Sequence, residues 1–278
     1  MALWVPPARF ANVQNNLVAT PSGTDWGVSI TGAGTANTKG AYSAGEIFSS
    51  TTYDTYLVVL GLYNTSGTNT NTSALLDIGI GASGSESTII SNLLVGWRPG
   101  VTVGGPTVFY LPIFIPAGSR VAGRVQGAQT SKVVRVAMWL YQGASQVPWR
   151  SYIGMDDYGV DTATSCGTSH TPGNTGAESA WASVGSTTSR NYDALFFLPQ
   201  GLAGVDTAML SSTQHWEIGY GSTTFCEYWE QSTTSEQTIG PVPGFPIPCS
   251  VPSGTQLQVR AEASATAEAR DVAIYGLY

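Results

Sequence analysis

Charged residues are scarce in this sequence. They make up 10% of its 278 residues, against roughly 25% in an ordinary soluble domain. The chain has two lysines, Lys39 and Lys132. Because helices in water rely on Glu, Lys and Arg for propensity and for ion pairs four residues apart, a mainly helical fold is excluded. Ser, Thr and Asn fill the gap, and 33 glycines with 15 prolines indicate many turns. These features predict an all-β chain.

Basic clusters and long apolar runs are also missing. The net charge is −7 and no three cations gather, so the chain has no footprint for nucleic acid or anionic lipid. No window approaches 18 apolar residues, which predicts no membrane insertion. Pro6, Pro7 and Arg9 stand where a signal peptide needs an apolar run. We therefore expect a soluble protein that is not exported.

Cysteine is rare and irregularly placed. Cys166, Cys226 and Cys249 are an odd number, with neither a CxxC pair nor the Cys/His spacing of a zinc site. A disulfide scaffold and a structural metal are therefore not expected, and no motif calls for a cofactor. Reduced, partly buried thiols are the expected state, with a Cys226–Cys249 bridge as the alternative.

The most informative feature is internal repetition. The segment 115–119, IPAGS, recurs as 251–255, VPSGT, at an offset of 136 residues. The same offset carries VAMW, residues 136–139, onto VAIY, residues 272–275. Upstream, IGIG at 78–81 matches IGYG at 218–221 at an offset of 140. A period of this length fits whole domains, so the sequence predicts an internal duplication.

The repeat divides the chain into an N-terminal arm at 1–17, unit one at 18–143, a linker at 144–171 without periodicity, and unit two at 172–278. Unit one holds six β-rich runs separated by turn signals, at 56–63, 75–80, 89–95, 108–115, 119–126 and 132–141. This density predicts two tandem jelly-roll-like β-sandwich domains. Continuous apolar runs such as Tyr110–Ile115 are typical of strands covered on both faces, in a sandwich or at a subunit interface.

Catalytic motifs are weak. Residues 79–84, GIGASG, match GxGxxG, but a β-branched strand follows where a dinucleotide site needs a helix. His170 and His215 have no copy in the other unit, and no GxSxG elbow supplies a nucleophile. We therefore expect no catalytic residues and no enzyme. A distant carboxylate pair for glycoside hydrolysis, drawn from Glu217, Glu227 and Glu230, stays open.

One acidic run could bind a cation. The segment MDDYGVD holds Asp156, Asp157 and Asp161, and oxygen-rich loops bind Ca²⁺. The spacing is not that of an EF-hand, and a solvated linker is the plainer alternative.

Unit two also carries an aromatic cluster. Trp216, Tyr228 and Trp229 are close in sequence to Glu227, and stacking rings beside hydrogen-bonding acids can bind sugars. The alternative is ordinary core packing, with strand alternation placing Tyr228 and Trp229 on opposite faces. We expect these rings to be largely buried.

The segments ALLDIGIGASGSESTIISNLLVG, FYLPIFIPAGSRVAGRVQ and VAMWLYQ resemble virion structural proteins of tailed bacteriophages, of the minor tail or decoration type. Those proteins carry one or two jelly-roll-like units. The shared motifs are turn and strand signatures, and unit two departs from them where HWEIGYG replaces LLDIGIG.

The resemblance implies a non-enzymatic component of a phage particle, in the tail or its adhesion apparatus, assembled in the bacterial cytoplasm. It implies a homo-oligomer, commonly a trimer, with other virion proteins as partners. Low charge and the apolar run Phe109–Ile115 also favour self-association. The alternatives are a capsid decoration protein and a carbohydrate- or receptor-binding module that contacts a host-surface glycan. A depolymerase-like hydrolase would need the acid pair named above.

Overall fold

The protein is nearly all β in the computed structural model, which describes residues 13–16, 27–64, 73–95, 107–142, 151–201, 212–221, 223–232, 246–264 and 269–278. The first half holds β1 (Val13–Asn15), β2 (Val28–Thr31), the 3-10 turn η1 (Tyr42–Ala44), β3 (Glu46–Phe48), β4 (Leu57–Asn64), β5 (Ala74–Ile80), β6 (Ser87–Val95), β7 (Thr107–Leu111), β8 (Val121–Gly127) and β9 (Val133–Tyr141). The second half holds β10 (Met155–Tyr158), β11 (Thr168–His170), β12 (Ala182–Ser183), β13 (Tyr192–Gly201), β14 (Ser212–Tyr220), β15 (Thr223–Ser232), β16 (Ile247–Val251), β17 (Leu257–Ala263) and β18 (Arg270–Leu277).

The six strands predicted in unit one are all present as β4 to β9, with shifted ends. The largest difference is β7, which was expected to run to Ile115 and ends at Leu111. Pro112 follows, and proline has no N–H to donate to a sheet ladder. Ile115 forms only an isolated bridge with Thr55.

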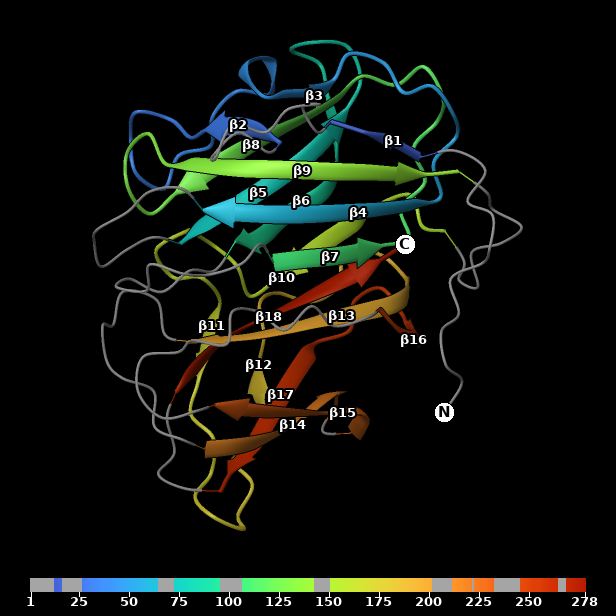
Figure 1. Cartoon of the computed structure of the whole chain (residues 1–278). Coiled ribbons are helices and arrows are strands. Elements are labelled where there is room, and N and C mark those ends of the chain that lie inside the picture. Colours follow the sequence, from blue (N-terminus) through green and yellow to red (C-terminus); the bar gives the residue numbers. More distant parts are fainter. Residues whose placement is uncertain are drawn as a thin grey trace.

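The strands β2 to β9 form a jelly roll, and β1 precedes it as an extra strand. One layer has the order β2-β9-β4-β7 and the other β3-β8-β5-β6, which is the strand order of two Greek keys folded into a sandwich. In Figure 1, β9, β4 and β7 form the front layer of the upper half, and β5, β6 and β8 cross behind them.

The second half repeats this order nine elements later. Its layers are β11-β18-β13-β16 and β12-β17-β14-β15. The register repeats as well: Ile78 faces Gly123 in β8, and Ile218 faces Val259 in β17, which are the offsets of 140 and 136 seen in the sequence. The two predicted jelly-roll-like sandwiches are therefore present. The common origin of the halves stays a prediction, which the repeated pairing supports.

The matching turns IPAGS and VPSGT are held in the same way. The Thr51 hydroxyl donates to the Pro116 carbonyl at 2.7 Å, and the Thr188 hydroxyl donates to the Pro252 carbonyl at 2.7 Å. Pro116 and Pro252 thus occupy equivalent places, as the repeat predicted.

The two jelly rolls share one sheet through β10. This strand pairs antiparallel with β18 and parallel with β6, so that nine strands form a continuous sheet across both halves. The expectation of a linker at 144–171 is therefore corrected from residue 151 onward. The segment contains β10 and β11, which both pair with β18 of the second jelly roll, and it lacked visible periodicity because both strands are short.

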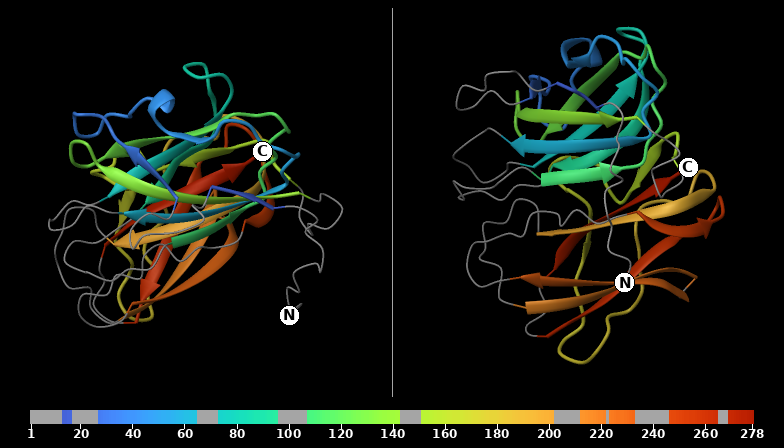
Figure 2. Two further views of the ribbon diagram at one scale, coloured as in Figure 1. Left: turned by 45° about the horizontal axis from the view of Figure 1, so that its top comes forward. Right: turned by 45° about the vertical axis from the view of Figure 1, so that its right-hand side comes forward.

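The strands β13 and β18 are buried on both faces. Ala194, Phe196 and Leu198 of β13 join the core of the first jelly roll, whereas Leu195 and Phe197 join the core of the second. Alternate residues of a strand point to opposite faces. The apolar run of β13 is continuous because one face of the strand packs inside its own sandwich and the other face packs against the first jelly roll. Figure 2 shows the two halves stacked with these strands at their junction.

Tyr275 fixes this junction. Its side chain is fully buried, and its hydroxyl donates to the Asn92 carbonyl at 2.9 Å and accepts the Leu94 amide at 3.0 Å. Phe196 lies beside Phe109 of the first jelly roll, with ring centroids 6.0 Å apart. One hydrophobic core therefore extends across both halves.

The three cysteines are free thiols. Cys166 is 2% exposed, and burial raises the pKa of its thiol to about 12. Cys226 and Cys249 are half-buried against the second core and form no bridge. The expected reduced state therefore describes this structure.

Most of the predicted arm at 1–17 lies outside the described residues, which start with the strand β1 at Val13. Across the ranges that the structure covers, no helix has the length and apolar character needed to span a membrane.

Candidate ligand-binding face

Of the aromatic residues proposed for sugar contact, Trp216 is the one whose side chain the structure describes. It is 0% exposed and packs in the second core. The suggestion that Trp216 contacts a ligand is therefore corrected, because no part of the ring is accessible. Along β14, Trp216 falls on the same alternation as Ile218, which is also a core residue. The side chains of Tyr228 and Trp229 lie outside the described part of the chain. In the strand register, Tyr228 faces Trp216 and Trp229 faces His215.

The predicted cation loop does not converge. Asp156 and Asp157 are neighbours on β10 and therefore point to opposite faces. Asp156 accepts the Tyr192 hydroxyl at 2.7 Å, and Asp157 accepts the Ser91 hydroxyl at 2.6 Å. Asp161 lies beyond the strand and is exposed. Within the described ranges, no group of three acids, histidines or cysteines is arranged for a metal.

The outer face of the four-stranded sheet β12-β17-β14-β15 instead gathers polar side chains; we call it the acidic face. On β14 and β17 it is the face opposite the core residues, because Val259 and Ala261 alternate with Arg260. The acidic face consists of Glu178, Trp181, His215, Glu217, Glu227, Arg260 and Glu262. Its charge is one-sided, with four carboxyl groups and one guanidinium.

Glu217, Arg260 and Glu178 form the centre of this face. The Arg260 guanidinium donates to Glu217 at 2.8 Å and to Glu178 at 2.6 Å. Burial alone would raise the pKa of Glu217, but hydrogen bonds from Thr224, Glu178 and Arg260 lower it to about 2. The pKa of Glu178 is raised, first by its hydrogen bond to Glu217 and then by burial. The two acids therefore act as a pair in which Glu178 holds its proton more firmly.

Trp181 lies beside this pair and is half-buried. The Arg260 guanidinium sits 4.8 Å from the centre of the indole ring, a cation–π distance. A Cβ added to Gly219 would come within 2.7 Å of the Trp181 ring. The ring therefore lies directly against the bare backbone of β14, where only glycine leaves room for it.

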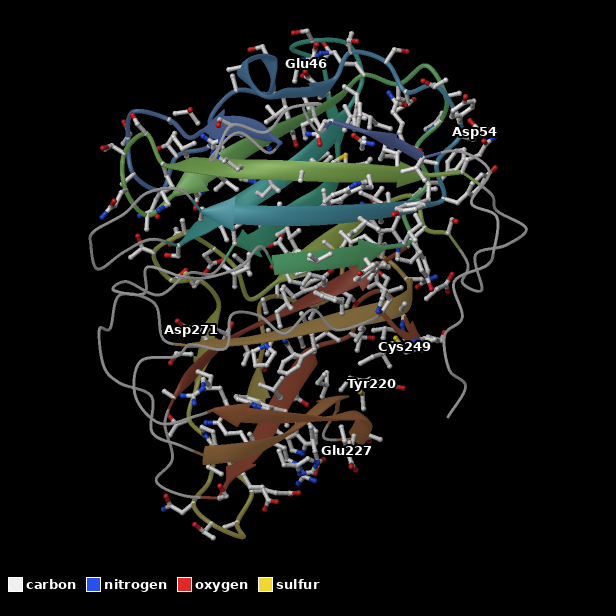
Figure 3. All side chains as sticks on the ribbon, viewed as in Figure 1. Glu46, Asp54, Tyr220, Glu227, Cys249 and Asp271 are labelled. Carbon is white, nitrogen blue, oxygen red and sulfur yellow. The ribbon has the colours of Figure 1, made fainter. Side chains whose placement is uncertain are left out.

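A second group of polar side chains flanks the centre toward β15. His215 Nε2 is 3.5 Å from Glu227, and His215 Nδ1 is 3.9 Å from Glu262. Glu227 is 62% exposed. Figure 3 shows Glu227 and Tyr220 at the β14–β15 hairpin, with Cys249 above them near β16.

The first jelly roll has a counterpart of the centre with a different charge. Arg124 donates to Asp77 at 2.8 Å and lies 4.5 Å above the Tyr42 ring. Lys39 also pairs with Asp77, at 2.6 Å. Thus an acid, an arginine and a ring recur, but Lys39 stands where the second jelly roll has Glu178, at an offset of 139. Tyr42 is buried and shares a hydrogen bond with Thr88 at 2.8 Å, whereas Trp181 is partly open. Of these two faces, as far as the structure describes their residues, the second is the one that combines excess negative charge with a partly accessible ring.

Sequence reasoning named Glu217 and Glu227 but missed Glu178, Trp181 and Arg260. The repeat contained a usable signal, since Tyr42 and Trp181 share the same offset of 139. The contact between Glu217 and Arg260 of β17 could not be found in this way. The two residues are 43 positions apart, and only strand pairing brings them together.

We expect Gly219→Ala to displace Trp181 and to lower the free energy of unfolding by about 1–3 kcal/mol, the usual cost of overpacking. The added methyl group would meet both the indole and the Thr223 carbonyl. Tryptophan fluorescence and denaturant unfolding measure the two effects. Gly34→Ala is the control, because its added Cβ meets nothing within 4 Å. Equal behaviour of both variants would contradict the contact.

Stability should depend on pH through Glu217. Its folded pKa of about 2 lies below the ordinary value of 4.5, so its contribution is complete above pH 4.5 and is lost as the pH falls toward 2. We expect the difference in unfolding free energy between wild type and Glu217→Gln to shrink over this range. The exposed Glu227→Gln is the matched control, for which we expect little change. A difference for Glu217→Gln that is constant from pH 6 to pH 2.5 would contradict the assignment.

Comparison with known proteins finds several structural likenesses, which include the following three. No protein-family model matches the chain, and no curated relative matches it. Two crystal forms of PNGF-II align with TM-scores of 0.40 (C2) and 0.39 (P21), each at 8% identity, over 90% and 95% of this chain. The chain spans 64% and 63% of those structures. The tandem CBM22-1–CBM22-2 domain of Paenibacillus barcinonensis Xyn10C aligns with a TM-score of 0.23 at 11% identity, over 96% of this chain and 92% of that one. At these TM-scores the likenesses carry no argument about function.

Proposed function

We propose that this protein is a non-enzymatic component of a bacteriophage particle, in the tail or its adhesion apparatus, and that its acidic face binds a saccharide. The observation that carries the binding role is the arrangement of Trp181, Arg260, Glu178 and Glu217 on one sheet face.

The chemistry of this face suits a sugar. Arg260 and the Gly219 backbone hold the indole in place, and the part of the half-buried ring that stays exposed offers an apolar surface to the C–H groups of a pyranose ring. Glu217 is buried, whereas Glu178 is 36% exposed; the Glu178 carboxyl group accepts hydrogen bonds, and sugar hydroxyls supply the donors. Four carboxyl groups against one guanidinium repel anionic ligands. We therefore propose a neutral or amino sugar rather than a uronic or sialic acid.

The same geometry supports a role without catalysis. The two carboxyl groups are about 5 Å apart in a retaining glycosidase, where one of them is the nucleophile, and about 6.5–9.5 Å apart in an inverting one, which needs room for the attacking water. Glu178 and Glu217 share a hydrogen bond, and Arg260 bridges them. Two carboxyl groups in hydrogen-bond contact have neither of these separations.

A binding experiment tests the sugar site. Purified protein is titrated calorimetrically with neutral, amino and acidic oligosaccharides. We expect binding of a neutral or amino sugar, and a loss of about 1–3 kcal/mol in binding free energy for Trp181→Ala, the combined stacking and burial contribution of a ring. Tyr53→Ala is the control, since Tyr53 is 38% exposed in the first jelly roll.

Two outcomes would contradict the proposal. One is wild-type affinity in Trp181→Ala, which would remove the face as the site. The other is cleavage of the oligosaccharide that is abolished by Glu217→Gln or Glu227→Gln, which would make the protein a hydrolase.

The phage setting rests on the sequence resemblance and has its own test. Labelling of intact particles with an antibody to this protein, viewed by electron microscopy, should mark the tail. Label on the capsid surface would favour the decoration alternative, and the absence of label on any particle would contradict a virion role.

A further inference from the structure

One shared strand joins the sheets of the two jelly rolls. The central strand β10 pairs with β18 on one side, where Met155 faces Leu277, and with β6 on the other, where Met155 bridges Ile90. Met155 is 1% exposed and belongs to the core that joins the halves. Both edges of β10 are therefore used within the chain.

The counterpart of β10 in the first jelly roll is β1. It pairs with β9 in the same register, with Val13 facing Tyr141 as Met155 faces Leu277. Among the described strands, the sheet order ends at β1. Val13 is 40% exposed, although it holds the place of the buried Met155.

The counterpart of β6 in the second jelly roll is β15. Ile218 faces Cys226 in β15 as Ile78 faces Ile90 in β6. Among the described strands, the four-stranded sheet ends at β15. A ten-residue strand at a sheet edge presents a row of backbone groups that can pair with another chain. Figure 1 places β1 and β15 at opposite ends of the molecule.

We propose that β1 of one copy adds alongside β15 of a second copy, in parallel, as β10 adds to β6 within the chain. Val13 then lies beside Cys226 of the second copy, in the places of Met155 and Ile90. The partner is another molecule of this protein, and the contact is head-to-tail. Such a contact closes into a ring when the rotation closes and otherwise grows into a filament; a ring of three copies would be the expected trimer.

The polar groups beside this contact are complementary. Within the chain, Asp157 on β10 accepts hydrogen bonds from Ser91 and Asn92 of β6, at 2.6 Å and 3.1 Å. In the register of the proposed contact, Asn15 holds the place of Asp157, and Glu227 holds the place of the Ser91–Asn92 pair. Within the chain the carboxylate is on β10 and the amide on β6. In the proposed contact the amide, Asn15, is on β1 and the carboxylate, Glu227, is on β15, so that a hydrogen-bond donor again faces an acceptor.

The proposed contact is independent of the sugar site. The counterparts of Glu178 and Arg260 are Lys39 and Arg124, which stay 26% and 30% exposed although the second jelly roll is docked on the first. Because β1 of a second copy would dock on β15 as β10 docks on β6, Glu178 and Arg260 should stay exposed in the same way. Failure of either proposal leaves the other standing.

A cross-linking experiment tests the neighbours directly. Val13→Cys is placed in a Cys249→Ser background, so that Cys226 is the nearest remaining thiol, and dissolved oxygen with copper–phenanthroline accepts the two electrons of disulfide formation. We expect dimers and higher multiples on a non-reducing gel. The matched control is Ile153→Cys in the same background, because Ile153 is equally aliphatic and 64% exposed but lies outside both strands. Adding Cys226→Ser to Val13→Cys should abolish the ladder.

Light scattering after size exclusion gives an independent readout at tens of micromolar. We expect wild type to be larger than its chain mass of 29.1 kDa. We expect Val13→Lys to raise the dissociation constant about tenfold or more, because the contact would bury an unpaired ammonium group, with thermal stability unchanged. A monomeric wild type overturns the proposal. An assembly that Val13→Lys leaves intact and that gives no ladder with Val13→Cys overturns it equally, because it must then use another surface.

Discussion

Tyr275→Ala is expected to lower the free energy of unfolding by about 3–5 kcal/mol, the usual cost of removing a large buried ring. The ring is fully buried at the junction of the two jelly rolls, 6.1 Å from the Phe196 ring centre. Its hydroxyl holds the Asn92 carbonyl and the Leu94 amide of β6. Because one core crosses the junction, wild type should unfold in a single transition, and the variant should shift that whole transition.

Denaturant unfolding followed by circular dichroism and by fluorescence measures both the free energy of unfolding and the number of transitions. Tyr275→Phe keeps the ring but leaves the Leu94 amide without its partner, so we expect a smaller loss of about 1–3 kcal/mol. Tyr53→Ala, at an exposed site, should change stability by less than about 0.5 kcal/mol. Two separate transitions in wild type, with Tyr275→Ala moving one of them, would show that the halves are independent.

Trp216→Ala is expected to lower the free energy of unfolding by about 3–5 kcal/mol, because it too removes a large buried ring. The indole is 0% exposed and packs against Phe197 and His170, with ring centres 5.8 Å and 5.7 Å away. It is the largest fully buried side chain of the second core. The loss should appear in the unfolding midpoint and in the near-ultraviolet circular dichroism of the second jelly roll.

Trp216→Phe separates the packing of the ring from its N–H. The Trp216 Nε1 has no hydrogen-bond partner within the described residues, and such a group costs free energy when buried. Removing it should offset part of the lost volume, so we expect Trp216→Phe to be clearly milder than Trp216→Ala. Tyr220→Ala, 37% exposed on the same strand, is the control. Unchanged stability in Trp216→Ala would mean that the ring is accessible, which would restore it as a candidate sugar contact.

Local sequence patterns determined the fold class and the strands β4 to β9 of the first jelly roll. The low charge, the β-rich runs and the Pro-Gly turns are read directly along the chain, and they predicted β4 to β9 with only their ends misplaced. The repeated IPAGS and VPSGT turns located the two jelly rolls, because both copies need the same residues to close the same corner.

The short strands and the candidate site depended on tertiary structure. The strand β10 has four residues, too few for a visible alternation, and it is a strand because β6 and β18 supply its hydrogen-bond partners. The aromatic cluster near Trp216 suggested a ligand site, but only the register of β14 in the sheet decides which residues face the core. Trp216 turned inward and Glu217 outward, and Arg260 and Trp181 reached Glu217 from distant strands and loops. The amino-acid sequence by itself determined which segments extend and turn, whereas only the pairing of strands far apart in the chain decided which side chains share a face, since that choice rests on burial and not on local conformation.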